Sequence, residues 1–498
     1  MKNLTFVFLL LLTSKVLVAQ KENNVWVGGR HVGLNFEGGN PVLFDRTDSA
    51  TFWRTNASVC DSAGNLLFYT NGPLIFNRNF QVMQNGDNLD VGDYATVTPG
   101  LLSVADGAAI VPKVDEPNKY YVFHVDLNWM DIDTLSQVLL PTHLYYSIVD
   151  MSLENGLGGV VGGQKDVLVF SDTLTENGMK IVKHGNGRDY WLLTHEANTN
   201  RYFRFLIDPD GIHGPYAQDI GVELRGYESL GFSPLVITQD GSRAAQLASA
   251  AMRVDLYDFD RCNGVFSLTD SFYVSDSAYY LLDGEFSSSG QYLYVSANWW
   301  NYIFQFDVTS PNIIATRQLI AVYDGATDPF NTDFDKLRLA PDDKIYVASY
   351  GSNRSLHVIN YPDNLGMACG FVENAVDLYP PGTNWSGLPN VINYSLGALV
   401  GSGCDTLTGI SKLPTPTFTL GVYPNPFSNE LQLSISGANT TASVSVTDVL
   451  GREVYGSTLL PVNQFIHQTV DLSLIATGVY FVVVDINGKW FAQKVVKH

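Results

Sequence analysis

The chain has 498 residues, of which 45% are hydrophobic and 12% aromatic, so it is long enough for two or three folded domains and is not disordered over most of its length. Its net charge of −21 excludes nucleic acid as a partner, because the few basic residues could not neutralise a run of phosphates.

Residues 1–19 have the pattern of a secretory signal peptide. Lys2 supplies the positive start, residues 4–12 form a short apolar run, and we expect cleavage after Ala19. The run is too short to span a bilayer and no later stretch is long enough, so we expect no transmembrane segment. The mature protein is therefore expected outside the inner membrane.

Four cysteines fit an oxidising compartment: Cys60, Cys262, Cys369 and Cys404. No CxxC spacing occurs, so we expect no zinc site. We also predict no other metal and no cofactor. Four cysteines allow three pairings. Because Cys369 and Cys404 flank the end of the middle region, we predict a disulfide between these two.

A turn followed by an aromatic-rich alternating strand recurs six times in the middle of the chain. The turns are centred roughly fifty residues apart, on Gly64, Asn118, Gly187, Gly241, Gly290 and Asp343. Glycine and asparagine permit a positive φ in such a turn. A period near fifty residues with several strands per repeat is typical of β-propeller blades.

Two leftover stretches at the ends of this region suggest how the ring closes. Residues 25–44 look like later strands of a blade, and residues 388–396 look like a leading strand. Together they predict a seventh blade made by both ends, which would leave no unpaired edge strand. The predicted fold is therefore all-β, with a seven-bladed propeller over residues 25–400; six or eight blades are the alternatives.

The C-terminal part differs in pattern from the middle. Residues 401–420 contain Thr and Pro without a sustained period and are predicted to be a linker. Residues 421–498 contain short alternating strands separated by turns, which predicts a small immunoglobulin-like β-sandwich.

Four short motifs follow one another in this last segment. Their residues are Tyr423, Pro424, Asn425, Pro426, Phe427, Asp448, Gly451, Arg452, Thr477, Gly478, Tyr480, Lys494 and Lys497. In this order they resemble the type A sorting domain of the type IX secretion system. The resemblance implies export through the periplasm to the outer cell surface or the medium, with the type IX and sortase machinery as partners. It also implies that a sortase removes the domain and that the protein is then attached or released. An ordinary accessory immunoglobulin-like domain is the alternative.

The middle region carries its own resemblance. The phrase SSSGQYLYVS followed by YIFQFDV resembles WD40-like and YVTN-type propellers, and GNLLFYTNG and KHGNGRDYWLLTH resemble propeller regions found with such sorting domains in Bacteroidetes surface proteins. These likenesses imply architecture and location, because that family has no settled activity.

Catalytic signatures are incomplete, so no catalytic residue is predicted. His195–Glu196 lacks the second histidine of a zinc-protease motif. Asp258 and Asp260 share one face of a strand and could serve a glycosidase if they lined the channel, but solvated outer-strand acids are the simpler interpretation.

Tryptophan beside asparagine supplies the candidate binding residues. Trp299 and Trp300 lie in one loop and Trp385 in another, and such residues can stack on sugar rings. The alternative is that they seal the packing between blades. The leading hypothesis is a non-catalytic binding or adhesion propeller with a glycan or protein ligand. A polysaccharide-active hydrolase or lyase and a structural surface-layer component are the alternatives.

Overall fold

The structure is a computed structural model, and it describes residues 21–48, 50–131, 137–223, 233–249, 251–274, 280–297, 301–384, 386–405, 419–436, 440–449, 451–461, 465–486 and 489–498. The chain divides into two compact units, residues 1–405 and residues 406–498. The predicted signal peptide and residues 406–418 of the predicted linker lie outside the described residues. Within the described ranges, none of the helices has the length and hydropathy needed to cross a membrane.

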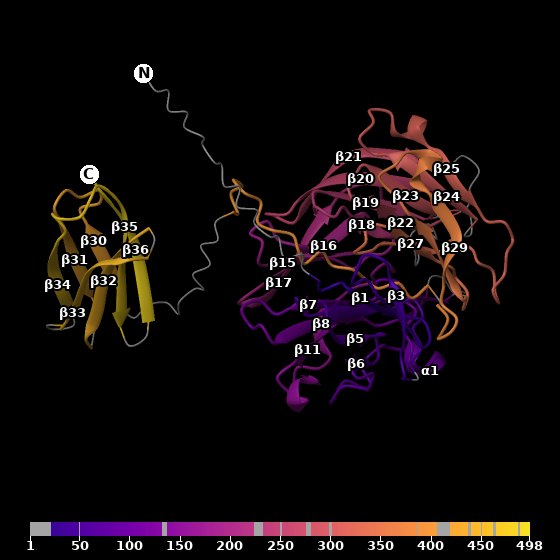
Figure 1. Ribbon diagram of the computed structural model, residues 1–498, viewed down its shortest axis with the longest axis horizontal. Coiled ribbons are helices and arrows are strands. Elements are labelled where there is room, and N and C mark those ends of the chain that lie inside the picture. Colours follow the sequence, from indigo (N-terminus) through magenta and orange to yellow (C-terminus); the bar gives the residue numbers. More distant parts are fainter. Residues whose placement is uncertain are drawn as a thin grey trace, which may run out of the picture. The chain divides into compact units, whose positions relative to one another are not determined.

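The first unit consists of small antiparallel sheets arranged around a common centre (Figure 1). The first two sheets contain β1 (Val25–Gly28), β2 (Val32–Asn35) and β3 (Val42–Asp45), then β4 (Ala57–Cys60), β5 (Leu66–Thr70) and β6 (Ile75–Asn77). The third contains β7 (Ala108–Pro112), β8 (Lys119–Val125), β11 (His143–Asp150), β12 (Gly159–Val160) and β13 (Val167–Ser171), with a hairpin of β9 (Asn128–Asp131) and β10 (Gln137–Leu140) beside it in the chain. A short helix, α1 (Tyr94–Val97), precedes this sheet.

Four further sheets each pair four consecutive strands in chain order. They are β14 (Lys180–Lys183), β15 (Tyr190–His195), β16 (Arg201–Asp208) and β17 (Gly211–Asp219); β18 (Leu235–Ile237), β19 (Arg243–Ala248), β20 (Arg253–Asp260) and β21 (Val265–Tyr273); β22 (Leu281–Phe286), β23 (Tyr292–Ala297), β24 (Tyr302–Asp307) and β25 (Gln318–Val322); and β26 (Lys336–Leu339), β27 (Ile345–Ala348), β28 (Ser355–Ile359) and β29 (Phe371–Asp377).

The burial of the strands shows which of them lie inside the ring. Strands β22, β23, β26 and β27 are buried along their whole length, whereas the last strands of these sheets, β25 and β29, alternate with solvent. Leu247 of β19 and Leu293 of β23 belong to one apolar core, so neighbouring sheets pack face to face. This packing buries faces that a single small sheet could not cover alone. The all-β fold and the propeller arrangement are thus confirmed, while the number of blades stays a prediction.

The repeated turn of the sequence occupies the same place in its sheets. It joins the first strand to the second, and a backbone N–H at the turn position bonds back to the carbonyl three residues earlier. The position has a positive φ at Gly64, Gly187, Gly241, Gly290 and Asp343. In the β7–β8 turn, Asp115 rather than Asn118 takes the positive φ. All these turns therefore lie at one end of the ring.

The ring closes where the first sheet meets the last. Trp26 of β1 packs edge-on against Tyr346 of β27 with ring centroids 5.8 Å apart. Beside it, the backbones of Arg30 and Thr383 exchange two hydrogen bonds of 2.7 and 3.2 Å. Gly29, at φ +51°, allows this approach, because a Cβ there would lie 1.9 Å from the Thr383 carbonyl oxygen.

The predicted leading strand at 388–396 is not a strand in the structure. Its backbone and side chains instead bond to β7, to β14 and to Asn23, which precedes β1, so the segment runs through the ring rather than pairing in one sheet. We call residues 386–404 the strap. The prediction was wrong because an apolar alternating pattern also fits a segment buried inside a ring.

The second unit is a β-sandwich. One sheet contains β30 (Thr419–Tyr423), β31 (Glu430–Ser436) and β34 (Phe465–Asp471), and the other contains β33 (Glu453–Leu459), β32 (Ala442–Asp448), β35 (Gly478–Ile486) and β36 (Lys489–Lys497). Alternate residues of both sheets form an apolar core that includes Leu431, Leu433, Val444, Val446 and Val482. The predicted sandwich is confirmed.

Candidate functional site

The tryptophans of the binding hypothesis, Trp299, Trp300 and Trp385, lie outside the described residues. Their neighbours Asn301 and Asn384 are described, and they belong to the same region of the propeller. Asn301 lines a cavity that also takes in Ser352, and the Ser352 hydroxyl lies 3.0 Å from that of Thr383, next to Asn384.

This cavity, which we call the rim pocket, has a volume of about 900 Å³. It is lined by loops that follow β25 and β27 and by the residue before β24: Asn301, Tyr323, Thr327, Pro329, Phe330, Asn331, Asp333, Tyr350, Gly351 and Ser352. Phe330 and Tyr350 are 57% and 38% exposed, so their aromatic faces are available to a ligand. Apolar rings with a few amide and hydroxyl groups are the usual composition of a small-molecule site.

Hydrogen bonds hold the loops of the rim pocket in place. Asn353 accepts from the backbone N–H of Phe330 at 3.2 Å and donates to the Asn331 carbonyl at 2.7 Å. Its own backbone pairs with that of Asn384 through two bonds of 2.8 Å. One buried asparagine therefore connects the pocket loop to the segment where the ring closes.

A carboxyl group lies at the bottom of the rim pocket. Asp333 is buried, and one of its oxygens accepts the Tyr350 backbone N–H at 2.9 Å. Burial, together with a smaller contribution from the nearby charge of Asp335, raises the pKa of this carboxyl to about 6, although the hydrogen bond from the Tyr350 backbone opposes the shift. Asp333 therefore carries a proton for part of the time near neutral pH, unlike an ordinary aspartate.

A second polar region occupies the centre of the ring. Asp106, which precedes β7, accepts hydrogen bonds from Lys180 of β14 at 2.5 Å, from Lys336 of β26 at 2.6 Å and from Arg338 of β26 at 2.9 Å. Arg338 also lies 3.4 Å from Glu285 of β22. These contacts join four sheets, so the inner strands face one another across a channel filled with ion pairs.

Burial and charge act against each other in this ion cluster. Burial by itself would raise the pKa of Asp106, but the positive charges of Arg338, Lys180 and Lys336 hold it below the ordinary value. Burial lowers the pKa of Lys336 to about 8 in spite of Asp106. It raises the pKa of Glu285, although Arg338 partly opposes that shift.

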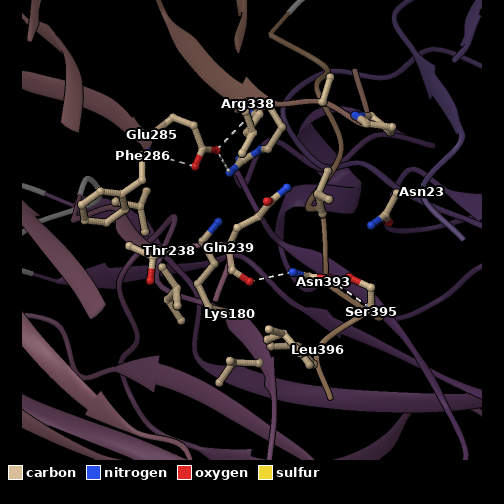
Figure 2. A pocket seen from close by; sticks show the side chains of 18 of the residues that line it. Asn23, Lys180, Thr238, Gln239, Glu285, Phe286, Arg338, Asn393, Ser395 and Leu396 are labelled. Carbon is tan, nitrogen blue, oxygen red and sulfur yellow. Dashed lines mark hydrogen bonds and ion pairs between the residues drawn. The ribbon is translucent and has the colours of Figure 1, made fainter. Parts of the chain in front are cut away.

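Beside the ion cluster the channel widens into a cavity of about 240 Å³, the channel pocket (Figure 2). Lys180, Glu285 and Arg338 line it from the inner strands, Thr238 and Gln239 line it from the β18–β19 turn, and the strap contributes Val391, Asn393, Ser395 and Leu396. Figure 2 shows Glu285 and Arg338 on one side and the strap residues Asn393 and Ser395 on another.

The strap follows the inner strands from their starts to their ends. The Asn390 amide donates to the carbonyls of Ala108 and Met179, near the starts of β7 and β14. The Tyr394 hydroxyl donates to the Ile110 carbonyl at 2.7 Å, and Arg261 then binds the Gly397 carbonyl at 2.8 Å beyond the strand ends.

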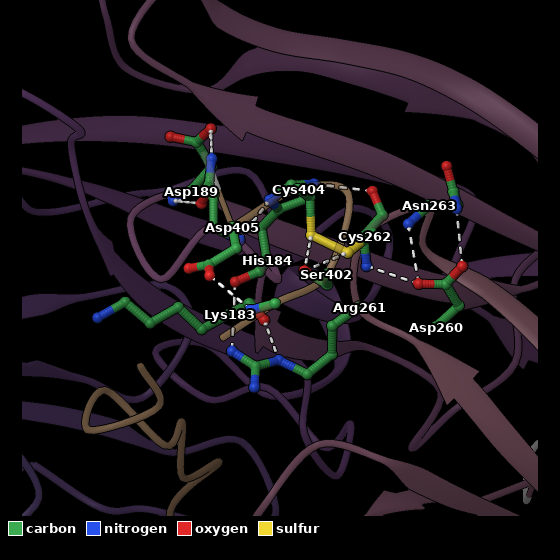
Figure 3. Close-up of a disulfide and its surroundings, with 12 residues drawn as sticks. Lys183, His184, Asp189, Asp260, Arg261, Cys262, Asn263, Ser402, Cys404 and Asp405 are labelled. Atoms are coloured by element: carbon green, nitrogen blue, oxygen red, sulfur yellow. Dashed lines mark hydrogen bonds between the residues drawn. A yellow bond between two sulfur atoms is a disulfide. The ribbon is translucent and has the colours of Figure 1, made fainter. Parts of the chain in front are cut away.

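A disulfide fixes the end of the strap (Figure 3). It joins Cys404 to Cys262, in the turn between β20 and β21, with Cα atoms 5.6 Å apart. The predicted Cys369–Cys404 bridge is therefore wrong: Cys369 is a free, buried cysteine in the short helix Gly366–Cys369. Proximity in sequence misled the prediction, because the strap carries Cys404 through the ring and away from Cys369.

Other residues singled out from the sequence lie away from these cavities. Burial lowers the pKa of His195 to about 4, and its ring packs edge-on against Tyr202. Asp258 is exposed on β20, and Asp260 accepts the Cys262 backbone N–H in the adjoining turn. Within the described residues, no group of His, Cys, Asp and Glu is arranged to hold a metal ion.

The first motif of the C-terminal unit docks on the last strand of the chain. The Asn425 side chain bonds to the Lys494 carbonyl at 2.8 Å and to the Val496 N–H at 3.0 Å. Phe427 is buried, and its backbone accepts from His498 and donates to Val496. The motif thereby ties the start of the sandwich to its end.

The remaining motif residues include both structural and exposed positions. The Lys497 ammonium is buried and donates to the carbonyls of Leu472, Ser473 and Ile475 at 2.7 to 3.0 Å. Arg452 forms a 2.7 Å ion pair with Asp448 in an exposed turn. The Tyr480 hydroxyl donates to the Ala476 carbonyl, whereas Tyr423 and Lys494 are exposed.

Comparison with known families identifies the second unit. The family model of the secretion system C-terminal sorting domain matches residues 421–498. This match confirms the resemblance seen in the motifs. The chain therefore carries a C-terminal sorting signal for the type IX secretion system, which delivers proteins to the cell surface or the medium.

Solved structures similar to this chain include β-propellers. A putative 6-phosphogluconolactonase from Bacteroides fragilis is 11% identical, with a TM-score of 0.39, and the match covers 74% of this chain and 96% of that one. A β-propeller domain from Myceliophteria thermophila is 12% identical, with a TM-score of 0.32, covering 66% of this chain and 93% of that one. No curated protein matches the sequence.

Sequence reasoning missed the ion cluster and the channel pocket. A local signal was present, because charged and apolar residues alternate in Lys336-Leu337-Arg338-Leu339 and in Asp283-Gly284-Glu285-Phe286. Such charges on a strand that is buried on both faces must find partners inside the protein.

Proposed function

We propose that the protein is a non-catalytic binding module of the cell surface and that it binds a glycan in the rim pocket. The observation that carries the proposal is one cavity that combines the exposed aromatic faces of Phe330 and Tyr350 with the amides of Asn301 and Asn331. Aromatic faces pack on the C–H faces of sugar rings, and amides bond to their hydroxyl groups. The sorting domain directs the pocket to the cell surface or the medium, where it can meet an extracellular glycan.

The sequence adds three aromatic residues to this proposal. Trp299 and Trp300 directly precede Asn301, and Trp385 directly follows Asn384. We keep them as proposed contacts of the same glycan.

The test is a glycan array probed with the purified exported protein, followed by calorimetry on any glycan that binds. Tyr350→Ala and Phe330→Ala are expected to weaken binding about tenfold or more each, because each removes an aromatic contact at the centre of the site. Trp299→Ala and Trp385→Ala are expected to act in the same direction.

Tyr361→Ala is the control, since Tyr361 is also an exposed aromatic residue but does not line the rim pocket. It should leave the affinity unchanged. If the array shows no glycan that depends on Tyr350 and Phe330, the proposal fails.

A second candidate function, cleavage of a polysaccharide, is favoured by Asp333. A carboxyl with a pKa of about 6 in the lining of the pocket suits proton donation to a leaving group. In that case Asp333→Asn would abolish release of reducing ends while the variant still bound the glycan. A wild-type protein that binds the polysaccharide without cleaving it excludes this candidate.

We also propose that the sorting domain is removed between residues 405 and 421, leaving the propeller as the working protein. Mass spectrometry of the exported protein tests this directly, because the expected C-terminus lies after Cys404. An exported chain that retains Lys497 would contradict it.

A further inference from the structure

The lining of the rim pocket combines aromatic rings with negative charge. Among the described residues, it contains three aromatic side chains, Tyr323, Phe330 and Tyr350, one carboxyl group, Asp333, and no lysine, arginine or histidine. The loop of residues 323–335, which supplies most of this lining, contains four aspartates and no basic residue. The pocket therefore offers a ligand a carboxyl group and aromatic faces but no positive charge.

The carboxyl group of Asp333 has no counter-ion. The residue is only 7% exposed, and one of its oxygens accepts the Tyr350 backbone N–H at 2.9 Å. Within the described part of the chain no other residue donates to the second oxygen, and this oxygen is not fully enclosed by protein atoms, so a ligand in the cavity can reach it. No positive side chain acts to lower the pKa of this carboxyl. A buried carboxylate without a partner is costly, so a positive charge supplied by a ligand would stabilise it.

The basic side chains closest to this part of the ring are already paired with other acids. Arg54 lies 3.7 Å from Asp335, and Arg354 lies 3.6 Å from Asp328. The three basic residues at the centre of the ring bind Asp106. None of these pairs neutralises the carboxyl group in the rim pocket.

The charges around the pocket are negative as well. The carboxylates of Asp324 and Glu373, which lie outside the lining, join Asp333 in raising the pKa of the Tyr323 hydroxyl above its ordinary value, although burial of that hydroxyl has the larger effect. Nearby negative charge favours the protonated form of a group, and for the same reason it favours a ligand that carries a positive charge.

An ammonium group fits both features of the lining. It can donate to the second oxygen of Asp333, and it is attracted to the face of an aromatic ring. An anionic ligand would meet only acids, and a neutral one would leave the carboxyl group without a counter-charge. Resting on the glycan-binding function proposed above, we propose that the rim pocket selects glycans with free amino groups and that Asp333 accepts a hydrogen bond from the ammonium.

Three trisaccharides with the same linkage test this selectivity: the trimers of glucosamine, N-acetylglucosamine and glucose. They differ in one substituent on each ring, and only the first carries ammonium groups. In calorimetry with the purified exported protein, at a pH at which those amino groups are protonated, the glucosamine trimer should bind about tenfold or more tightly than either neutral trimer. A neutral trimer that binds equally or more tightly overturns the inference but leaves the proposed glycan-binding function in place.

Asp333→Asn tests the residue itself. The amide keeps an oxygen that can accept the Tyr350 N–H and removes only the charge. The affinity for the glucosamine trimer should fall about tenfold to a hundredfold, the usual range for a lost hydrogen bond to a charged group, while the affinity for the neutral trimers should change by less than about twofold.

Asp324→Asn is the matched control, because it removes the same charge from an exposed position of the same loop outside the lining. Its oxygen can still accept the Ala326 N–H. Since exposed charges are screened by salt, the affinity for the glucosamine trimer should stay within about twofold of the wild type. An equal loss in both variants would overturn a direct contact with Asp333.

The remaining outcomes separate this inference from the function on which it rests. Unchanged affinity for the glucosamine trimer in a folded Asp333→Asn, or no binding of this trimer by the wild type, overturns the inference. The proposed function is judged separately, by whether any glycan on the array depends on Tyr350 and Phe330. If circular dichroism shows that Asp333→Asn is unfolded, the comparison of the three trimers on the wild type decides.

Discussion

The propeller and the sandwich treat polar groups in their interiors differently. Within the propeller, Asp106, Lys180, Lys336 and Arg338 form a charged cluster at the centre of the ring. The core of the sandwich is apolar, and the buried Lys497 is bound by backbone carbonyls rather than by a counter-ion.

The difference follows from the two architectures. Two sheets that face each other leave no gap between their apolar sides, whereas a ring leaves a channel where its inner strands cannot touch. Side chains must fill that channel, and charged ones can do so only when they pair. The propeller thus has a polar interior that could bind a ligand. In the sandwich, by contrast, Asn425, Phe427 and Lys497 of the motifs stabilise the domain itself.

The largest loss of folding stability should come from a substitution in the ion cluster at the centre of the propeller. Asp106→Asn removes the negative charge shared by three buried cations and is expected to cost about 3–5 kcal/mol, because uncompensated positive charges then remain inside the protein. Chemical denaturation of the full chain measures it. Asp270→Asn, on an exposed outer strand, is the control and should change little. A near-normal Asp106→Asn would mean that the ion cluster does not hold the ring together.

Loss of the Cys262–Cys404 disulfide should have the next largest effect, about 2–4 kcal/mol. The two cysteines are 142 residues apart in sequence, so the bridge lowers the conformational entropy of a long stretch of the unfolded chain. Calorimetry of Cys404→Ser should show a lower melting temperature for the propeller alone. Cys369→Ser should not reproduce this drop, since Cys369 is free.

Within the sandwich, Lys497→Met should cost about 1–3 kcal/mol, because three carbonyls lose their buried donor. The melting temperature of the isolated transition of this unit is the measurement. Lys494→Met, at an exposed position three residues earlier on the same strand, should be neutral. Equal effects of the two changes would contradict the structural role given to Lys497.

A pH-dependent effect is expected at Glu176, a buried carboxyl before β14. Burial raises its pKa to about 7 from 4.5 although Arg54 opposes the shift, so the folded state holds this proton more tightly than the unfolded state. The wild type should therefore lose stability as pH rises from about 4.5 to 7. Glu176→Gln should be more stable than the wild type by about 1–3 kcal/mol at pH 8 and nearly equal to it at pH 4. A difference that grows towards acid pH would contradict this sign.

The smallest effect on stability is expected from Arg452→Ala in the sorting domain. Its ion pair with Asp448 is exposed, and such pairs contribute little, so the melting temperature should not change. If the motif serves recognition, the variant should nevertheless be exported less, with the protein retained in the periplasm. Cell fractionation separates these outcomes, and normal export would remove Arg452 from the recognition surface.

Local patterns predicted much of the fold. The turns at Gly64, Gly187, Gly241 and Gly290 could be placed because a turn position with a positive φ favours glycine, which is visible in the sequence. The sorting motifs could be placed because they are short and ordered. The ion cluster could not, since Asp106 and Arg338 lie 232 residues apart and no motif fixes how the ring brings them together.

The strap and the true disulfide were missed for the same reason. Residues 388–396 look like a strand, and only the closed ring shows that they run through its interior. The glycan site stays a prediction. Of the tryptophans that suggested it, Trp300 directly precedes Asn301, which lines the rim pocket.

The position of the disulfide has a mechanical consequence. Cys404 is the last residue but one of the first unit, so a pull on the chain beyond it reaches Cys262 through a covalent bond. The force is then transmitted to the β20–β21 hairpin and not to the strap. Without the disulfide, the same force would break the hydrogen bonds of the strap one after another. A propeller held to a cell by its C-terminal end could thus bear drag from flowing medium while its channel pocket kept its shape.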